Sequence, residues 1–190
     1  MNKFFLALVL LAPMAQADWQ LDNEQSRLSF VSTKAGAVAE VHYFEQLEGG
    51  VDEQGELALS IQLASVQTAI DIRNQRMREL LFQTERFPSA TLTATLDSAA
   101  LDALPPGSQS TMQLEALLRI RDQQLPLAVE VTVARLDAQT LLVQSRQPLV
   151  VYASQLGLSD GVEALREVAG LPSISPAVPV SFNLTFREDG

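Results

Sequence analysis

The stretch MQLEALLRIRDQQLPLAVEVTV (residues 112–133) alternates apolar and polar residues on both sides of a short polar interruption. A period of two residues is typical of strands that bury one face, as the strands of antiparallel sheets do. The polar interruption at residues 121–124 predicts a tight turn, so the whole stretch predicts a β-hairpin. The apolar positions are Met112, Leu114, Ala116, Leu118 and Ile120 before the turn, and Leu125, Leu127, Val129, Val131 and Val133 after it.

The same alternation continues outward from this hairpin in both directions. It is clear at residues 57–63 and 178–186, and glycine- or proline-containing turns separate the segments. The pattern predicts about eight strands, at roughly 18–33, 37–48, 51–68, 90–99, 110–121, 124–136, 139–153 and 177–187. Eight antiparallel strands favour an all-β barrel, which is filled by its own side chains or holds one small ligand. A β-sandwich is the alternative.

Two short segments have helical spacing and interrupt the strands. In IDIRNQRMRELLFQTERFP (residues 70–88), a helix at 74–83 would place Met77, Leu80 and Leu81 on one side. A second helix at 162–169 would end at Gly170. In a small barrel such helices cover an open end. Cations beside apolar side chains suit an amphiphilic ligand, although a solvated cap paired to nearby acids explains the first helix equally well.

The first residues have the features of a secretory signal peptide. Lys3 precedes an apolar run at residues 4–12, and Ala15-Gln16-Ala17 is a small-x-small cleavage site. We expect residues 1–17 to be removed after Ala17, which leaves one domain at residues 18–190 in the periplasm of a Gram-negative source. The apolar run is too short to span a membrane. Because the chain has no cysteine, a lipoprotein anchor and disulfides are excluded.

The chain is strongly acidic, with a formal net charge of −10. Removal of Lys3 leaves 12 basic against 23 acidic residues, a net charge of −11. Such a charge repels phosphate backbones and anionic membranes, which argues against a nucleic-acid partner.

No motif predicts catalysis, a metal site or a cofactor. Residues 157–161 (GLSDG) match G-x-S-x-G, but a nucleophile elbow needs a histidine after the serine, and the one histidine, His42, precedes it. One histidine without cysteine cannot form a closed zinc or copper site. His42 itself has two interpretations: a surface or hydrogen-bonded structural histidine, or a polar contact inside a ligand cavity.

Several short motifs follow one another along the chain: Trp19-x-Leu21-Asp22, Ser26, Phe30, Gly49-x-Val51, Arg76 with residues 80–82, Phe87-Pro88, and LPSISPAVPVSF at 171–182. Their order and spacing resemble the YceI-like family of exported lipid-binding proteins. The resemblance implies an eight-stranded lipocalin-like barrel around a long apolar molecule, such as a polyisoprenoid or an isoprenoid quinone. Two positions differ from the pattern of many members, which have Asp at Met77 and Gly at His42.

The resemblance and the strand pattern together predict a periplasmic binding or carrier protein for an isoprenoid or other amphiphilic lipid. Two alternatives are an enzyme that acts on such a lipid with His42 beside Glu40, and a ligand-free barrel that serves as a stress-response or interaction module. A homodimer is left open. The candidate ligand contacts are Phe30, His42, Phe44, Leu59, Ile61, Arg76, Met77, Leu80, Phe82, Leu114, Val129 and Phe182.

Overall fold

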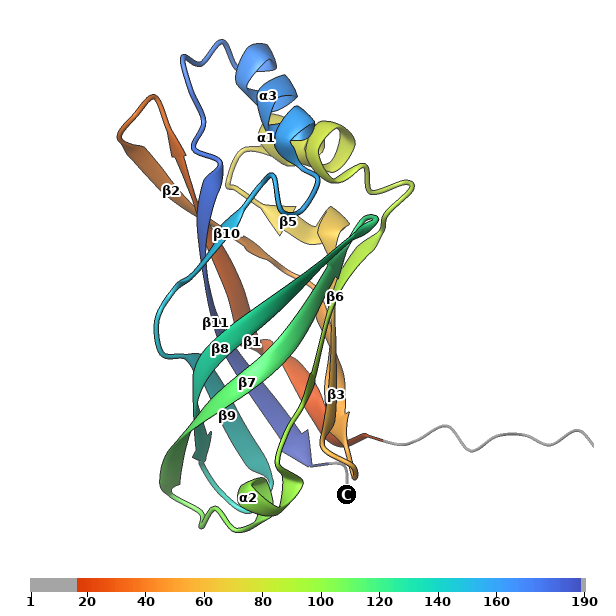
Figure 1. The fold of residues 1–190 in the computed structure, drawn as a ribbon, viewed down its shortest axis with the longest axis vertical. Coiled ribbons are helices and arrows are strands. Elements are labelled where there is room, and N and C mark those ends of the chain that lie inside the picture. Colours follow the sequence, from red (N-terminus) through yellow and green to blue (C-terminus); the bar gives the residue numbers. More distant parts are fainter. Residues whose placement is uncertain (1–16, 189–190) are drawn as a thin grey trace, which may run out of the picture.

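Hydrogen bonds between the first and last strands close the sheet into a barrel (Figure 1). In the computed structural model, which describes residues 17–188, β1 (Ala17–Lys34) pairs antiparallel with β11 (Ala177–Glu188). On its other side, β1 pairs with β2 (Val38–Phe44) and β3 (Leu47–Asp52). This closure confirms the predicted barrel and excludes the sandwich.

From β3 the sheet continues through five neighbouring strands until it returns to β11. Their order is β4 (Glu56–Gln62), β6 (Ser89–Thr95), β7 (Ser108–Ile120), β8 (Gln123–Arg135) and β9 (Thr140–Ser145). Two short strands, β5 (Val66–Gln67) and β10 (Leu149–Tyr152), pair with β2 and β11 near one end of the barrel.

The short strands are continuations of longer ones, so the barrel has the eight strands that the sequence predicts. Between β9 and β10, Pro148 has no N–H to donate to a neighbouring strand. Between β2 and β3, the chain bends where the Gln46 N–H donates to Ser65 Oγ at 3.0 Å. One predicted boundary is wrong: β3 extends to Asp52, whose carboxylate accepts from two N–H groups of the following turn.

The β7–β8 hairpin forms in the predicted register and is tighter than predicted. Its ladder runs from Ser108↔Arg135 to Ile120↔Gln123, so the turn consists of two residues instead of four. Arg121 adopts φ +52° to make this turn.

Helices close both ends of the barrel (Figure 1). At one end, α1 (Asp71–Arg76) runs directly into the π-helical segment η2 (Met77–Phe82), and α3 (Ser159–Val168) packs on it. We call this the covered end. Both predicted helices are therefore confirmed, each starting three residues earlier than expected. The sequence analysis missed α2 (Ser98–Asp102) at the opposite end and the single turn η1 (Leu63–Ser65).

The predicted signal peptide lies outside the described residues except for Ala17. Within residues 17–188, no helix has the length and apolar character needed to cross a membrane.

Candidate functional site

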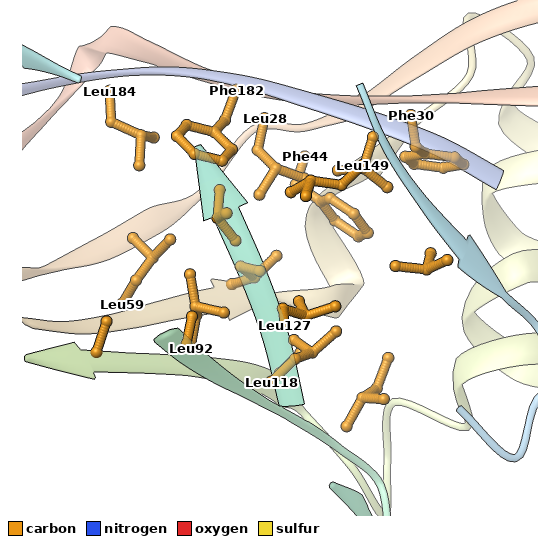
Figure 2. A pocket seen from close by; sticks show the side chains of 18 of the residues that line it. Leu28, Phe30, Phe44, Leu59, Leu92, Leu118, Leu127, Leu149, Phe182 and Leu184 are labelled. Atoms are coloured by element: carbon orange, nitrogen blue, oxygen red, sulfur yellow. The ribbon is translucent and has the colours of Figure 1, made fainter. Parts of the chain in front are cut away.

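The interior of the barrel contains a cavity of about 230 Å³ that has no polar wall residue. All 36 residues that line it are Leu, Ile, Val, Ala or Phe. Figure 2 shows side chains from opposing strands, among them Leu28, Leu59 and Phe182, directed into this common space. Water in such a cavity would lack the polar partners that hold buried water. The cavity is therefore suited to a hydrocarbon.

The strand residues predicted as ligand contacts line this cavity, because alternation places every second side chain inside. These are Phe30, Phe44, Leu59, Ile61, Leu114, Val129 and Phe182, together with Phe82 from η2. The other four predicted contacts, His42, Arg76, Met77 and Leu80, do not line it. Contact of any of the twelve with a ligand stays a prediction.

Two helices and a turn form the cavity wall at the covered end. Leu81 and Phe82 come from η2, Leu156 and Leu158 from the turn before α3, and Val162 from α3. Leu80 is only half-buried, whereas Leu81 and Phe82 are buried. The sequence analysis assumed an α-helical period for these residues, but the i→i+5 bonding of a π-helix changes which side chains face the barrel.

Gly161 allows α3 to lie directly on η2. A Cβ built on Gly161 would be 2.8 Å from both Leu80 O and Leu81 Cα, which is closer than real Cβ contacts. Ser159 of the same G-x-S-x-G string is exposed at the first position of α3. The structure thus gives this string a packing role.

Arg76 joins the two covering helices. Its Nη1 donates to the carbonyl oxygen of Val168, the last residue of α3, at 3.3 Å. The adjacent Met77 is buried. Within residues 17–188, Arg76 therefore links α1 to the last residue of α3.

A polar network attaches α1 to the barrel rim. Arg73 donates from Nη1 to Glu40 of β2 at 2.8 Å and from Nη2 to the Thr68 carbonyl oxygen at 2.6 Å. Hydrogen bonds from Lys34 and then from Arg73 lower the pKa of Glu40. Buried Asn74 accepts from the N–H of Thr68 at 2.8 Å.

The sequence analysis missed Arg73 and Asn74. The one available signal was Glu40, which alternation places on the same face as His42 and Phe44 and which therefore needs a cation nearby. With four arginines between residues 70 and 88, that signal does not identify which arginine approaches Glu40.

His42 is buried beside the cavity wall, with 2% of its surface exposed. Its Nε2 lies 2.8 Å from Ser32 Oγ, and its ring packs edge-on against Phe30 at a centroid distance of 5.4 Å. Among residues 17–188, its Nδ1 has no hydrogen-bond partner. Burial lowers the pKa of His42, and the Arg73 cation lowers it further, so the ring is neutral at pH 7. This resolves the two sequence-based interpretations only in part, since His42 is buried next to the cavity and does not line it.

A family model for the YceI-like domain matches residues 19–186. The chain belongs to the YceI-like family. A solved polyisoprenoid-binding domain from Saccharophagus degradans, implicated in plant cell wall breakdown, is 38% identical and superposes with a TM-score of 0.90. The match covers 92% of this chain and all of that one.

Two more distant solved structures share the fold of this YceI-like domain. BcnA of Burkholderia cenocepacia is 20% identical over 87% of this chain and 98% of its own, with a TM-score of 0.66. The YceI protein of Campylobacter jejuni is 11% identical over 78% of this chain and 85% of its own, with a TM-score of 0.56. The comparison with curated proteins gives no match.

Ser26 is one of the residues on which the YceI-like resemblance rests. Its side chain forms hydrogen bonds at a point where the sheet is irregular. The β1–β11 register shifts between Asp22 and Arg27. There Ser26 Oγ accepts from the Thr185 N–H at 3.0 Å and donates to the Asp22 carbonyl oxygen at 2.7 Å. A buried serine thus replaces ladder bonds that the shift removes.

Proposed function

We propose that this chain is an exported binding or carrier protein for a long isoprenoid-type lipid, a polyisoprenoid or an isoprenoid quinone, held in the barrel. The observation that carries the proposal is the cavity inside the barrel, which has 36 apolar wall residues and no polar one. The domain from Saccharophagus degradans, at 38% identity, is a polyisoprenoid-binding domain, which supports this class of ligand. The family and this neighbour indicate a binding protein and not an enzyme.

Tail burial supplies the larger part of the affinity in this proposal. Burying about ten methylenes contributes roughly 8 kcal/mol, at ~0.8 kcal/mol each, before the cost of association is subtracted. One charge-assisted hydrogen bond to a head group adds about 1.5–3 kcal/mol. A change in the apolar wall should therefore alter affinity more than the loss of one polar contact.

The head group, in our proposal, lies at the covered end, where Arg76 and His42 are its polar contacts and Met77 and Leu80 flank it. Two observations support this placement. The ring of His42 packs on Phe30, which lines the cavity, and Arg76 lies at the joint of the helices that cover it.

Mass spectrometry of lipids extracted under denaturing conditions from the purified chain tests the proposal. We expect a co-purifying prenyl compound in amounts comparable to the protein. Chemical conversion of that compound during incubation would indicate the enzyme alternative. A barrel that stays empty after expression in several hosts and incubation with polyprenols and quinones would contradict the proposal and leave the interaction-module alternative.

Export is the second part of the proposal, because the residues that predict it lie outside residues 17–188. N-terminal sequencing of the protein from a periplasmic fraction should begin at Asp18. A chain recovered only from the cytoplasm with Met1 intact would contradict export and leave the ligand proposal unaffected.

A further inference from the structure

Five exposed apolar side chains lie on helix α1, directly before it, or on the two elements that polar contacts join to it. Among residues 17–188, eight large apolar residues are 45–69% exposed. Exposed apolar residues are ordinary when they are scattered singly, whereas a group at one end of a molecule is typical of an interaction surface. We call the group the apolar rim; it consists of Val38, Val41, Ile70, Ile72 and Val168.

Polar contacts hold the three segments of the rim together. The Arg73–Glu40 ion pair joins α1 to β2, which carries Val38 and Val41. The hydrogen bond from Arg76 to the carbonyl of Val168 joins α1 to the end of α3. These contacts fix the three segments that carry the rim relative to one another. Helix α3 carries both a rim residue, Val168, and a cavity-wall residue, Val162, within ten residues.

The charge of the molecule is distributed unevenly between its two ends. The covered end, taken as residues 34–42, 66–88, 121–124 and 152–176, has seven cations and eight acids, a net charge of −1. The rest of residues 17–188 has five cations and 14 acids, a net charge of −9. The acidic surplus that argues against contact with anionic surfaces thus belongs to the barrel wall and the α2 end.

The distance between the acidic residues of the α2 end and the apolar rim determines whether these acids oppose contact through the covered end. Strand β7 has 13 residues. At ~3.3 Å per residue and a tilt of about 40°, the barrel is on the order of 30 Å long. The Debye length at physiological salt is about 8 Å, so acids at the far end are largely screened from a surface that touches the rim.

We propose that the apolar rim docks on a lipid bilayer and that the lipid enters and leaves the barrel there. This inference rests on the proposed function. A long isoprenoid lipid resides in a bilayer, and each methylene that must cross water lowers the population in transit about fourfold. Contact between the rim and the bilayer places the cavity wall of η2 and α3 next to the lipid source, so that transfer avoids the aqueous route.

Two substitutions with matched exposure and charge test this surface. Ile72 in the rim is 53% exposed, and Leu136 in the β8–β9 turn near the α2 end is 52% exposed. The mature chain and its Ile72→Asp and Leu136→Asp variants are mixed with phosphatidylcholine vesicles that contain a fluorescent polyprenol. Uptake of the probe is followed in time, and equilibrium binding of the same probe is measured from detergent micelles.

We expect Ile72→Asp to slow uptake from vesicles roughly tenfold, because one apolar contact with the bilayer is lost, and Leu136→Asp to leave the rate unchanged. All three proteins should bind the probe equally from detergent. Equal uptake rates in the two variants would overturn the docking surface. If the rate of uptake depends on Ile72 only after a periplasmic extract is added, that result would also overturn the bilayer as the partner and would indicate a protein acceptor. Failure of the parent chain to bind from detergent would instead contradict the proposed function.

Discussion

His42 makes the free energy of unfolding depend on pH near neutrality, where neither carboxylates nor amines titrate. It is the one histidine of the chain. Burial, and then the Arg73 cation, lower its pKa below the ordinary value of 6.5. Below pH 6.5 the unfolded chain therefore binds more protons than the folded chain does. The contribution of the neutral, buried His42 to the free energy of unfolding is complete above pH 6.5 and is lost as the pH falls. The slope reaches at most about 1.4 kcal/mol per pH unit.

Urea unfolding at pH 7.5, 6.5 and 5.5 measures this contribution. We expect the parent chain to lose stability over the interval and His42→Gln to lose little. The lowered pKa of Glu40 acts only below its ordinary value of 4.5, outside the interval. Parallel pH profiles for the parent and the variant would show that His42 is not buried in its neutral form.

Gly49 illustrates a residue whose role the sequence motif could not explain. A Cβ at Gly49 would lie 2.1 Å from the carbonyl oxygen of Ala58 on neighbouring β4, whereas a Cβ at Gly36 would meet nothing within 4 Å. Both glycines have φ in the left-handed range, at +147° and +80°. We predict that Gly49→Ala lowers the unfolding free energy by about 3 kcal/mol or more and Gly36→Ala by about 1 kcal/mol. Equal losses in chemical denaturation would contradict the close approach of the two strands.

At the scale of elements, the cover ends in a strained residue. Gln83 follows η2 with φ +53°, a conformation that glycine adopts without a Cβ clash and that commonly ends helices. We predict that Gln83→Gly raises the unfolding free energy by about 0.5–1 kcal/mol, whereas Gln83→Ala gives no gain. A lower midpoint for the glycine variant than for the alanine variant in thermal unfolding would contradict this reading of the helix end.

Substitution of Arg76 distinguishes two roles of the covering helices, namely contact with the head group of the ligand and bracing of the fold. As a head-group contact, Arg76→Ala should weaken binding of a polyprenol by about tenfold to a hundredfold, at ~1.4 kcal/mol per tenfold, and affect the corresponding bare hydrocarbon less. Isothermal titration with both ligands measures the difference. Equal weakening for both would mean that Arg76 only braces α1 against α3 through Val168, and no weakening would leave the helix as a solvated cap.

The elements that sequence analysis predicted are those whose pattern is local. The β7–β8 hairpin repeats its alternation over 13 paired positions, so neighbouring residues alone specify it. Helix α2 has five residues, too few for a helical period, and its one signal is the Asp97 side chain that accepts from the Ala100 N–H at 3.1 Å. Segment η2 is π-helical and packs against α3, and a sequence period shows neither feature.

At the scale of the whole molecule, the apolar part of the candidate site was predictable and the polar part was not. Alternation sorts inner from outer residues, so Leu59 and Phe182 could be placed in the barrel before its closure was known. The Arg73–Glu40 pair joins residues 33 positions apart through the placement of α1 on the rim. That placement follows from packing of the complete barrel, which no segment specifies alone.

A matched pair of cavity substitutions tests the central claim most directly, namely that the ligand occupies the barrel interior. Ala116 lines the cavity from β7, and Ala128 is exposed on the outer face of the neighbouring β8. Titration of a fluorescent polyprenol into Ala116→Phe and Ala128→Phe, with folding checked by circular dichroism, compares the two faces of one wall. The account predicts that Ala116→Phe folds and binds at least about tenfold more weakly, because its ring takes the space of the ligand, and that Ala128→Phe binds like the parent chain. Unchanged affinity in a folded Ala116→Phe would place the ligand outside the barrel and contradict the account.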